Sequence, residues 1–278
     1  VGVLGVSASA ILVRFSQAPS GVTAAYRLGW TVLLLLPVVL LRCRAELRRV
    51  TARDLVLCGA SGVLLALHFL TWFESLKRTS VASSTVLVST EVIFTAWLAL
   101  FLHGKIPRLG VWAILLAFGG SALLALSGGG GAGELSGNLL ALAAASAAAV
   151  YTSSDGYSGA IVTTVYTFLT YLPAFSPCCW ARRGGDALTG YGGREWLIGL
   201  ALAVLCTLLG HSLFSWCLKY LSPSYVSAAK LCEPVFSSLA AIPLFGEVPG
   251  PLQLAGGAAV LGAVLLYTWA EREKTPAG

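Results

Sequence analysis

Residues 89–107, STEVIFTAWLALFLHGKIP, lie over residues 231–249, LCEPVFSSLAAIPLFGEVP, when the chain is shifted along itself by 142 positions. The shift places Glu91 over Glu233. Leucines match by chance in any two apolar helices, whereas acidic, glycine and proline positions seldom match at one fixed offset. The other matching pairs are Phe94–Phe236, Ala99–Ala241, Leu102–Leu244, Gly104–Gly246 and Pro107–Pro249. The chain therefore contains an internal repeat.

Composition places the chain in a membrane. Of its residues, 57% are hydrophobic and 11% are charged, whereas soluble domains carry about 25% charged residues. We expect an all-α integral membrane protein with the lipid bilayer around it. The net charge of +6 indicates no nucleic-acid partner, because much of it lies in one short loop. The seven cysteines lack a CxxC spacing, so we expect no metal site and no cofactor.

The apolar segments indicate ten membrane spans, because a helix needs about 20 apolar residues to cross the hydrocarbon. The expected spans are 1–18, 21–41, 54–76, 80–102, 108–127, 136–154, 160–180, 196–218, 224–245 and 251–270.

The repeat divides these spans into two groups of five. We expect repeats over 1–127 and 136–270, a glycine-rich linker at 128–135, and a tail at 271–278. Because five is odd, the second repeat enters the membrane from the opposite side. Inverted repeats of this kind are typical of secondary transporters, whose substrate site lies near the midplane between the repeats.

Loop charges predict the orientation. Loop 42–53, RCRAELRRVTAR, holds five arginines, and loops rich in Lys and Arg stay in the cytoplasm. An even number of spans then places both termini in the cytoplasm. We expect the inner membrane of a bacterium.

Residues 68–94, HFLTWFESLKRTSVASSTVLVSTEVIF, and 211–247, HSLFSWCLKYLSPSYVSAAKLCEPVFSSLAAIPLFGE, resemble the EamA-type branch of the drug/metabolite transporter superfamily. The resemblance covers essentially the whole chain. It implies ten spans and the export of small metabolites such as amino acids, without naming one substrate. The first repeat departs from the pattern, because Val92 stands where the second has Pro234, and Lys105 stands where it has Glu247. A broken helix is therefore expected mainly in the second repeat.

A few ionisable side chains fall inside the expected spans. Each costs roughly 2.5–3.5 kcal/mol on insertion scales and is by default a functional hypothesis. They are Arg14, Arg27, His68, Glu74, Glu91, His211, Lys230 and Glu233.

Lys230 and Glu233 are three residues apart on one helix, close enough to pair. They either cancel each other's charge so that the helix inserts, or face a central cavity. Pro234 and Pro243 favour the cavity, because backbone groups freed by proline are tolerated where they meet protein or water.

Glu91 either couples transport or forms an ion pair with Arg14 or Arg27. His68 and His211 are candidates for a proton relay with the two glutamates. Aromatic walls could come from Trp72, Trp97, Tyr166 and Trp216, although such rings also pack or face lipid. These residues are the candidate substrate and coupling site.

The leading interpretation is a secondary transporter of small metabolites that works by alternating access, with possible proton coupling. An uncoupled facilitator or exchanger of amphipathic compounds is the alternative. A membrane enzyme is not expected, because the sequence contains no HExxH or comparable cluster. A channel is not expected either, because the sequence contains no motif that would form a ring-shaped selectivity filter. Without a GxxxxGK[ST] motif, ATP does not drive transport.

Overall fold

The described residues of the computed structural model are 2–103, 108–127, 132–155, 163–180, 188–211, 213 and 232–272. They form helices joined by short loops, and no strand occurs among them. Five helical segments are long and apolar enough to cross a membrane: Ser20–Arg42, Ala52–Arg78, Gly133–Tyr151, Gly193–Gly210 and Pro251–Ala270. The chain is therefore an all-helical integral membrane protein, as its composition predicts.

The helices of the first half are α1 (Gly2–Phe15), α2 (Ser20–Arg42), α3 (Arg44–Leu47), α4 (Ala52–Arg78), α5 (Val81–Val88), α6 (Glu91–His103) and α7 (Arg108–Ser127). Those of the second half are α8 (Ala132–Asp155), α9 (Thr163–Trp180), α10 (Gly193–Ala201), the π-helix η3 (Leu202–His211), α13 (Cys232–Phe245) and α14 (Pro251–Arg272).

The helix bounds differ from the expected spans in several places, and the expected span 196–218 begins as α10 and continues as the π-helix η3. Helix α8 begins at Ala132 rather than at residue 136, inside the segment expected to be a linker. Loop 42–53 contains the short helix α3. The expected span 80–102 is two helices, α5 and α6, and not one. The count of ten spans stays a prediction.

The break between α5 and α6 lies at Ser89 and Thr90, where the Thr90 N–H bonds the Leu87 carbonyl, three residues back, at 3.1 Å. Ser89 Oγ donates to the Thr85 carbonyl at 2.9 Å, and Thr90 Oγ1 donates to the Leu87 carbonyl at 2.6 Å. Each hydroxyl shares its carbonyl with the N–H of the same residue, and hydroxyl bonds of this kind often bend helices. The first half therefore contains a broken helix, although it has no proline there.

Helix α13 contains both prolines at which the sequence suggests a break. Pro234 is the third described residue of α13. Pro243 lies inside the same helix, which continues to Phe245. A break beside Pro234 stays a prediction, because the residues before Cys232 lie outside the described ranges, and α13 ends two residues after Pro243.

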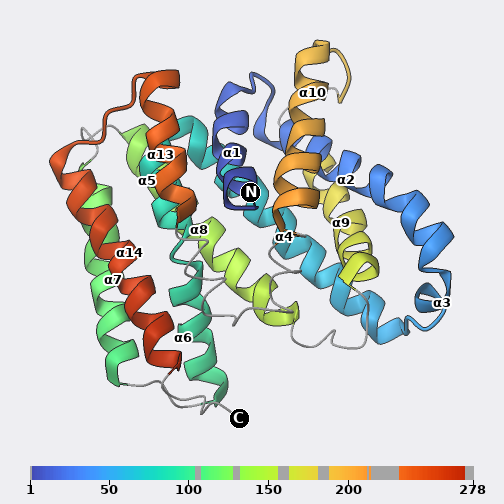
Figure 1. The fold of residues 1–278 in the computed structure, drawn as a ribbon, viewed down its shortest axis with the longest axis horizontal. Helices are drawn as coiled ribbons and strands as arrows, with labels where there is room; N and C mark the ends of the chain where they lie inside the picture. Colours follow the sequence, from blue (N-terminus) through green and yellow to red (C-terminus); the bar gives the residue numbers. More distant parts are fainter. Residues whose placement is uncertain are drawn as a thin grey trace.

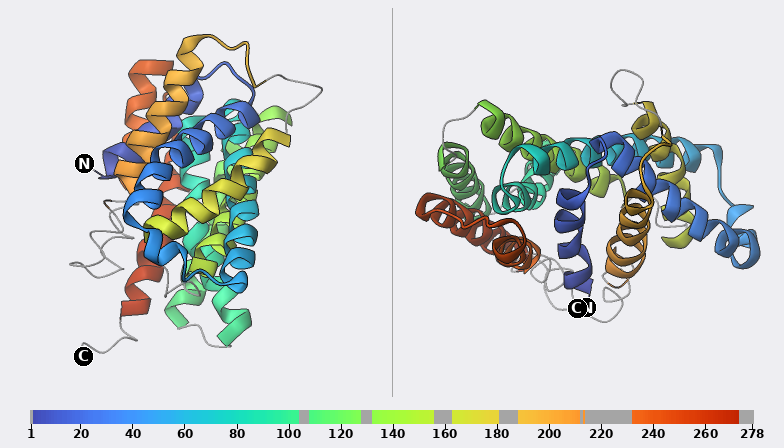
Figure 2. Two further views of the ribbon diagram at one scale, coloured as in Figure 1. Left: turned by 90° about the vertical axis from the view of Figure 1, so that its right-hand side faces the viewer. Right: turned by 90° about the horizontal axis from the view of Figure 1, so that it is seen from above.

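Helix pairs between the two halves build the bundle. Helices α7 and α14 lie side by side along their length (Figure 1), and seen from above they form one end of the molecule, with α2 and α3 at the other (Figure 2). Helix α4 packs against α8 and α9, and α1 packs against η3 and α13. The largest buried apolar cluster lies where α1, α2 and α4 meet, around Leu28, Phe69 and Phe73.

Glycines allow two of these helix pairs to approach closely. A Cβ at Gly120 would lie 2.8 Å from the Gly256 carbonyl oxygen, and one at Gly256 would lie 2.9 Å from the Gly120 oxygen. A Cβ at Gly5 of α1 would lie 2.7 Å from the Leu205 oxygen of η3. In membranes, small residues at such contacts bring backbones into van der Waals contact.

Candidate functional site

Arg27 is the largest fully buried side chain among the described residues, at 1% exposed. Its Nε donates to Thr207 Oγ1 and its Nη1 to Ser9 Oγ, each at 3.0 Å. The guanidinium carbon lies 4.3 Å from the centre of the Phe69 ring. Residues of α1, α4 and η3 thus surround the charge from three sides. Within the described part of the chain, no carboxylate lies within 4.0 Å of this guanidinium.

His68 lies beside this arginine, one residue before Phe69 on α4. Its Nδ1 is 2.9 Å from the Ala144 carbonyl oxygen of α8. A carbonyl oxygen only accepts, so this bond assigns the proton to Nδ1 and leaves Nε2 as an acceptor. The imidazole and Trp72 rings lie 5.7 Å apart. Trp72 Nε1 is buried and has no hydrogen-bond partner within the described ranges. His68 and Trp72 therefore share a face, as their spacing predicts.

Glu91 and Glu233 occupy equivalent places. Each lies in the first turn of its helix, Glu91 at the start of α6 and Glu233 in α13 as described. A carboxylate is favoured at the start of α6, because a helix N-terminus carries a partial positive charge. Ser7 Oγ of α1 donates to the Glu233 carbonyl oxygen at 3.4 Å, so the described start of α13 lies against a helix that also contacts Arg27. Arg27, His68 and the two glutamates, the charged candidates of the sequence, are here called the central cluster.

The remaining predicted residues divide by position. Tyr166 is buried on α9, a helix that packs against α2 and α4. Lys230, Trp216 and the side chain of His211 lie outside the described residues, and with them the Lys230–Glu233 pair.

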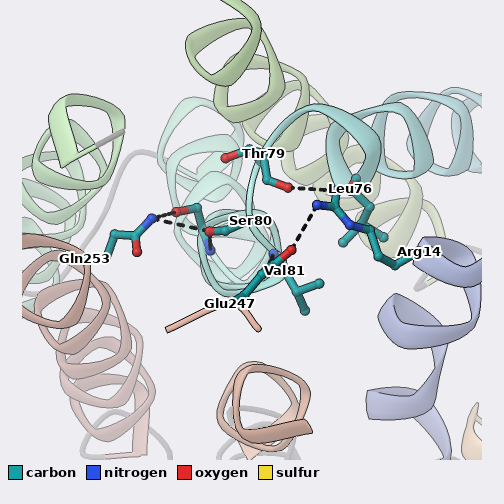
Figure 3. Close-up of polar contacts among 8 residues, drawn as sticks. Arg14, Leu76, Thr79, Ser80, Val81, Glu247 and Gln253 are labelled. Carbon is teal, nitrogen blue, oxygen red and sulfur yellow. Dashed lines mark hydrogen bonds and ion pairs between the residues drawn. The ribbon is translucent and has the colours of Figure 1, made fainter. Parts of the chain in front are cut away.

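Arg14 lies at the end of α1 and belongs to a second polar group (Figure 3). Its Nη2 forms an ion pair with Glu247 Oε1 at 2.9 Å, and its Nη1 donates to the carbonyls of Leu76 and Thr79. Across the ranges that the structure describes, neither Arg14 nor Arg27 forms an ion pair with Glu91. Arg14 instead ties the end of α4 to the loop after α13.

Glu247 also binds the start of α5. Its Oε2 accepts from the Val81 N–H at 2.7 Å, one of the donors that a helix N-terminus leaves unpaired. Next to it, Gln253 of α14 donates to Ser80 Oγ at 3.3 Å and to Ser83 Oγ at 3.2 Å. Figure 3 shows both contacts reaching the first turn of α5 from the second half of the chain.

A third polar contact holds the loop between α1 and α2. Glu195, at the start of α10, is 7% exposed. It accepts from Ser16 Oγ at 2.6 Å and from the Gln17 N–H at 3.1 Å. The neighbouring Arg194 donates to the Phe15 carbonyl at 3.0 Å. The buried carboxylate thus anchors this loop to the second half.

Sequence reasoning missed several of these partners. Ser9 and Thr207 carry no charge and resemble ordinary small residues of a membrane helix. Glu247 had one usable signal, because it is the acidic counterpart of Lys105 and breaks the symmetry of the repeat. Glu195 stands in a loop-proximal segment where an exposed acid is the usual interpretation.

Comparison with known proteins gives the following. The model of the EamA-like transporter family matches residues 1–126 and 135–269. No curated protein matches the chain. A solved structure described only as "Crystal structure of protein" is 20% identical, with a TM-score of 0.65, and the alignment covers 99% of this chain and 96% of that one. At that identity, the likeness shows a shared fold.

Proposed function

Because the chain belongs to the EamA-like transporter family, a branch of the drug/metabolite transporter superfamily, we propose that it is a secondary transporter of small carboxylate-bearing metabolites such as amino acids. Two inverted five-helix repeats, over 1–127 and 136–270, rock against each other around a midplane site. Both termini lie in the cytoplasm of a bacterium, and the protein resides in the inner membrane.

Helix directions support the inverted repeats. Helix α4 ends where α8 begins, since Arg78 bonds Ser136 at 3.4 Å and Thr79 bonds Asn138 at 2.8 Å. The repeat makes α1 equivalent to α8, α2 to α9, and α4 to α10 with η3. When equivalent helices are exchanged, the contact of α4 with α8 becomes that of η3 with α1, and the contact of α4 with α9 becomes that of α10 with α2, and all four contacts occur. Exchange of equivalent helices between two similar halves produces this pattern.

The observation that carries the substrate class is Arg27. A buried charge is costly unless it is paired, yet this guanidinium meets only hydroxyls and a ring among the described residues. A substrate carboxylate would supply the missing partner, in the bidentate geometry that arginine favours. Glu91 and Glu233 then face the ammonium group of an amino acid, and His68 contributes a neutral acceptor.

Coupling to protons is the second part of the proposal. A glutamate that must be ionised to hold the substrate and neutral to release it would link proton movement to transport. Glu91 and Glu233 are the candidates, with His68 and His211 as relays. The uncoupled facilitator remains the alternative and predicts transport without any effect of a pH gradient.

The test is uptake of labelled amino acids by purified protein in liposomes, with and without a pH gradient. Arg27→Gln should lower uptake at least about tenfold, the factor for losing one charge-assisted bond. Glu91→Gln and Glu233→Gln should remove the response to the gradient. Glu74→Gln is the matched control, because Glu74 pairs with Arg78 of its own helix at 2.6 Å. Unchanged transport in the first three variants would refute the proposal.

A further inference from the structure

Helix α5 is held by hydrogen bonds at its first turn, and the interruption between α5 and α6 begins directly after its last residue. Its first N–H is bound by Glu247, which comes from the other half of the chain. Its last residue, Val88, precedes the interruption at Ser89 and Thr90. Between these points α5 is a rigid piece of eight residues. Glu91, a member of the central cluster, follows directly after the break.

Glu247 is well placed to hold α5 across the two halves. The loop that carries it leaves α13 through Gly246, whose φ of 68° is open to glycine at little cost. The carboxylate uses one oxygen for Val81 and the other for Arg14. It thus joins three elements of both halves with two charge-assisted bonds, which are about twice as strong as neutral ones.

Gln253 holds the same turn of α5 from a second direction. Its side-chain nitrogen bridges Ser80 and Ser83, and its oxygen accepts from the Gly250 N–H at 3.1 Å. The amide is therefore fixed at both ends. Glu247, from the loop after α13, and Gln253, from α14, both bind the first turn of α5. Any separation of the two halves at this end breaks both contacts.

We propose that α5 is the moving gate of the transporter, with the Glu247 contacts to Arg14 and Val81 as the latch that keeps it closed and Ser89–Thr90 as its hinge. Release of the latch lets α5 swing about the hinge and opens this end of the bundle. Because Glu91 follows the hinge, the swing also moves a residue of the central cluster. The gate rests on the proposed function, because a carrier must open one end of its bundle to admit or release substrate.

The first experiment measures gate opening without any substrate. Thr85 lies one turn after Val81 on the same face of α5 and is 3% exposed, and its hydroxyl bonds only carbonyls of its own helix. Thr85→Cys, with the seven native cysteines replaced, is placed in lipid nanodiscs and treated with a maleimide. Its rate of labelling reports how often α5 opens.

Glu247→Gln should accelerate this labelling at least about tenfold, because a lost charge-assisted bond shifts a two-state equilibrium by such a factor. Glu74→Gln, which removes a carboxylate bonded within its own half, should leave the rate unchanged. If Glu247 only fastens the fold, its variant melts at a lower temperature but is labelled at the parent rate well below that temperature. Equal rates in the two variants overturn the gate.

A covalent lock gives the second experiment. Ser83→Cys and Gln253→Cys place thiols where side chains now meet at 3.2 Å, and a short bifunctional thiol reagent would join them. Transport should stop on cross-linking, whereas each single-cysteine variant should retain transport after the same treatment. Undiminished transport by the cross-linked protein overturns the gate. A wrong substrate class leaves the labelling result untouched, so failure of the proposed function is distinguishable from failure of the gate.

Discussion

Gly120 should tolerate no larger residue, whereas its neighbour Gly119 should. A Cβ at Gly120 would meet the Gly256 oxygen at 2.8 Å and the Val260 nitrogen at 2.9 Å, and both atoms belong to the backbone of α14. Nothing lies within 4 Å of a Cβ at Gly119. Gly120→Ala therefore forces α7 and α14 apart, while Gly119→Ala adds a methyl group to open space.

The magnitude follows from the atoms that clash. Overpacking a well-packed contact costs about 1–3 kcal/mol, and the value should lie in the upper half because backbone atoms cannot turn away as a side chain can. Alanine favours a helix over glycine by about 1 kcal/mol. Gly120→Ala should then destabilise by about 1–2 kcal/mol, and Gly119→Ala should be neutral or stabilising.

The assay is thermal unfolding of detergent-purified protein, followed by loss of the monodisperse peak in size-exclusion chromatography. At about 2–4 °C per kcal/mol for a protein of this size class, Gly120→Ala should melt several degrees below the parent. The double variant Gly120→Ala/Gly256→Ala should lose less than the sum of the single losses, because helices already separated leave room for the second methyl. Equal melting of the Gly119 and Gly120 variants would refute the close approach of α7 and α14.

Two further predictions concern the loop anchor and the hinge. Glu195→Ala leaves Ser16 Oγ and the Gln17 N–H without their buried acceptor, so stability should fall by about 1–3 kcal/mol, and an unchanged melting temperature would contradict the anchor. Ser89→Ala/Thr90→Val removes the hydroxyls that share carbonyls with N–H groups at the break, so α5 and α6 should join into one helix. Transport should slow while thermal stability is kept, and uptake at the parent rate would show that the break is not needed.

The sequence predicts the class of fold because its signals are additive over many residues. Long apolar runs define membrane helices, and polar matches at one offset define a repeat. The break at Ser89–Thr90 escapes such reasoning, because it depends on local hydrogen bonds of the backbone and of two hydroxyls.

The sequence singles out the charged members of the candidate site and offers no signal for their neutral partners. Arg27, His68 and Glu91 are expensive in a membrane, so each stands out in the sequence and each lies in the central cluster. Ser9 and Thr207 carry no charge and cost little free energy in a membrane helix, so their role is seen only when α1 and η3 are packed together. Glu247 was overlooked because it lies at the end of a helix, where charge is ordinary, and its bond partners are backbone groups far away in the chain.

The π-helix η3 makes residues 202–211 more sensitive to the deletion or insertion of a residue than to a substitution. Its backbone bonding between Leu202 and His211 repeats at five residues, whereas an ordinary helix repeats at four. Deleting one residue between these two positions would restore the ordinary repeat. It would also turn α10 by about 100° against everything that follows and carry Thr207 away from Arg27. We therefore expect that homologues which lack one residue of η3 differ in function more than homologues which differ there by a substitution.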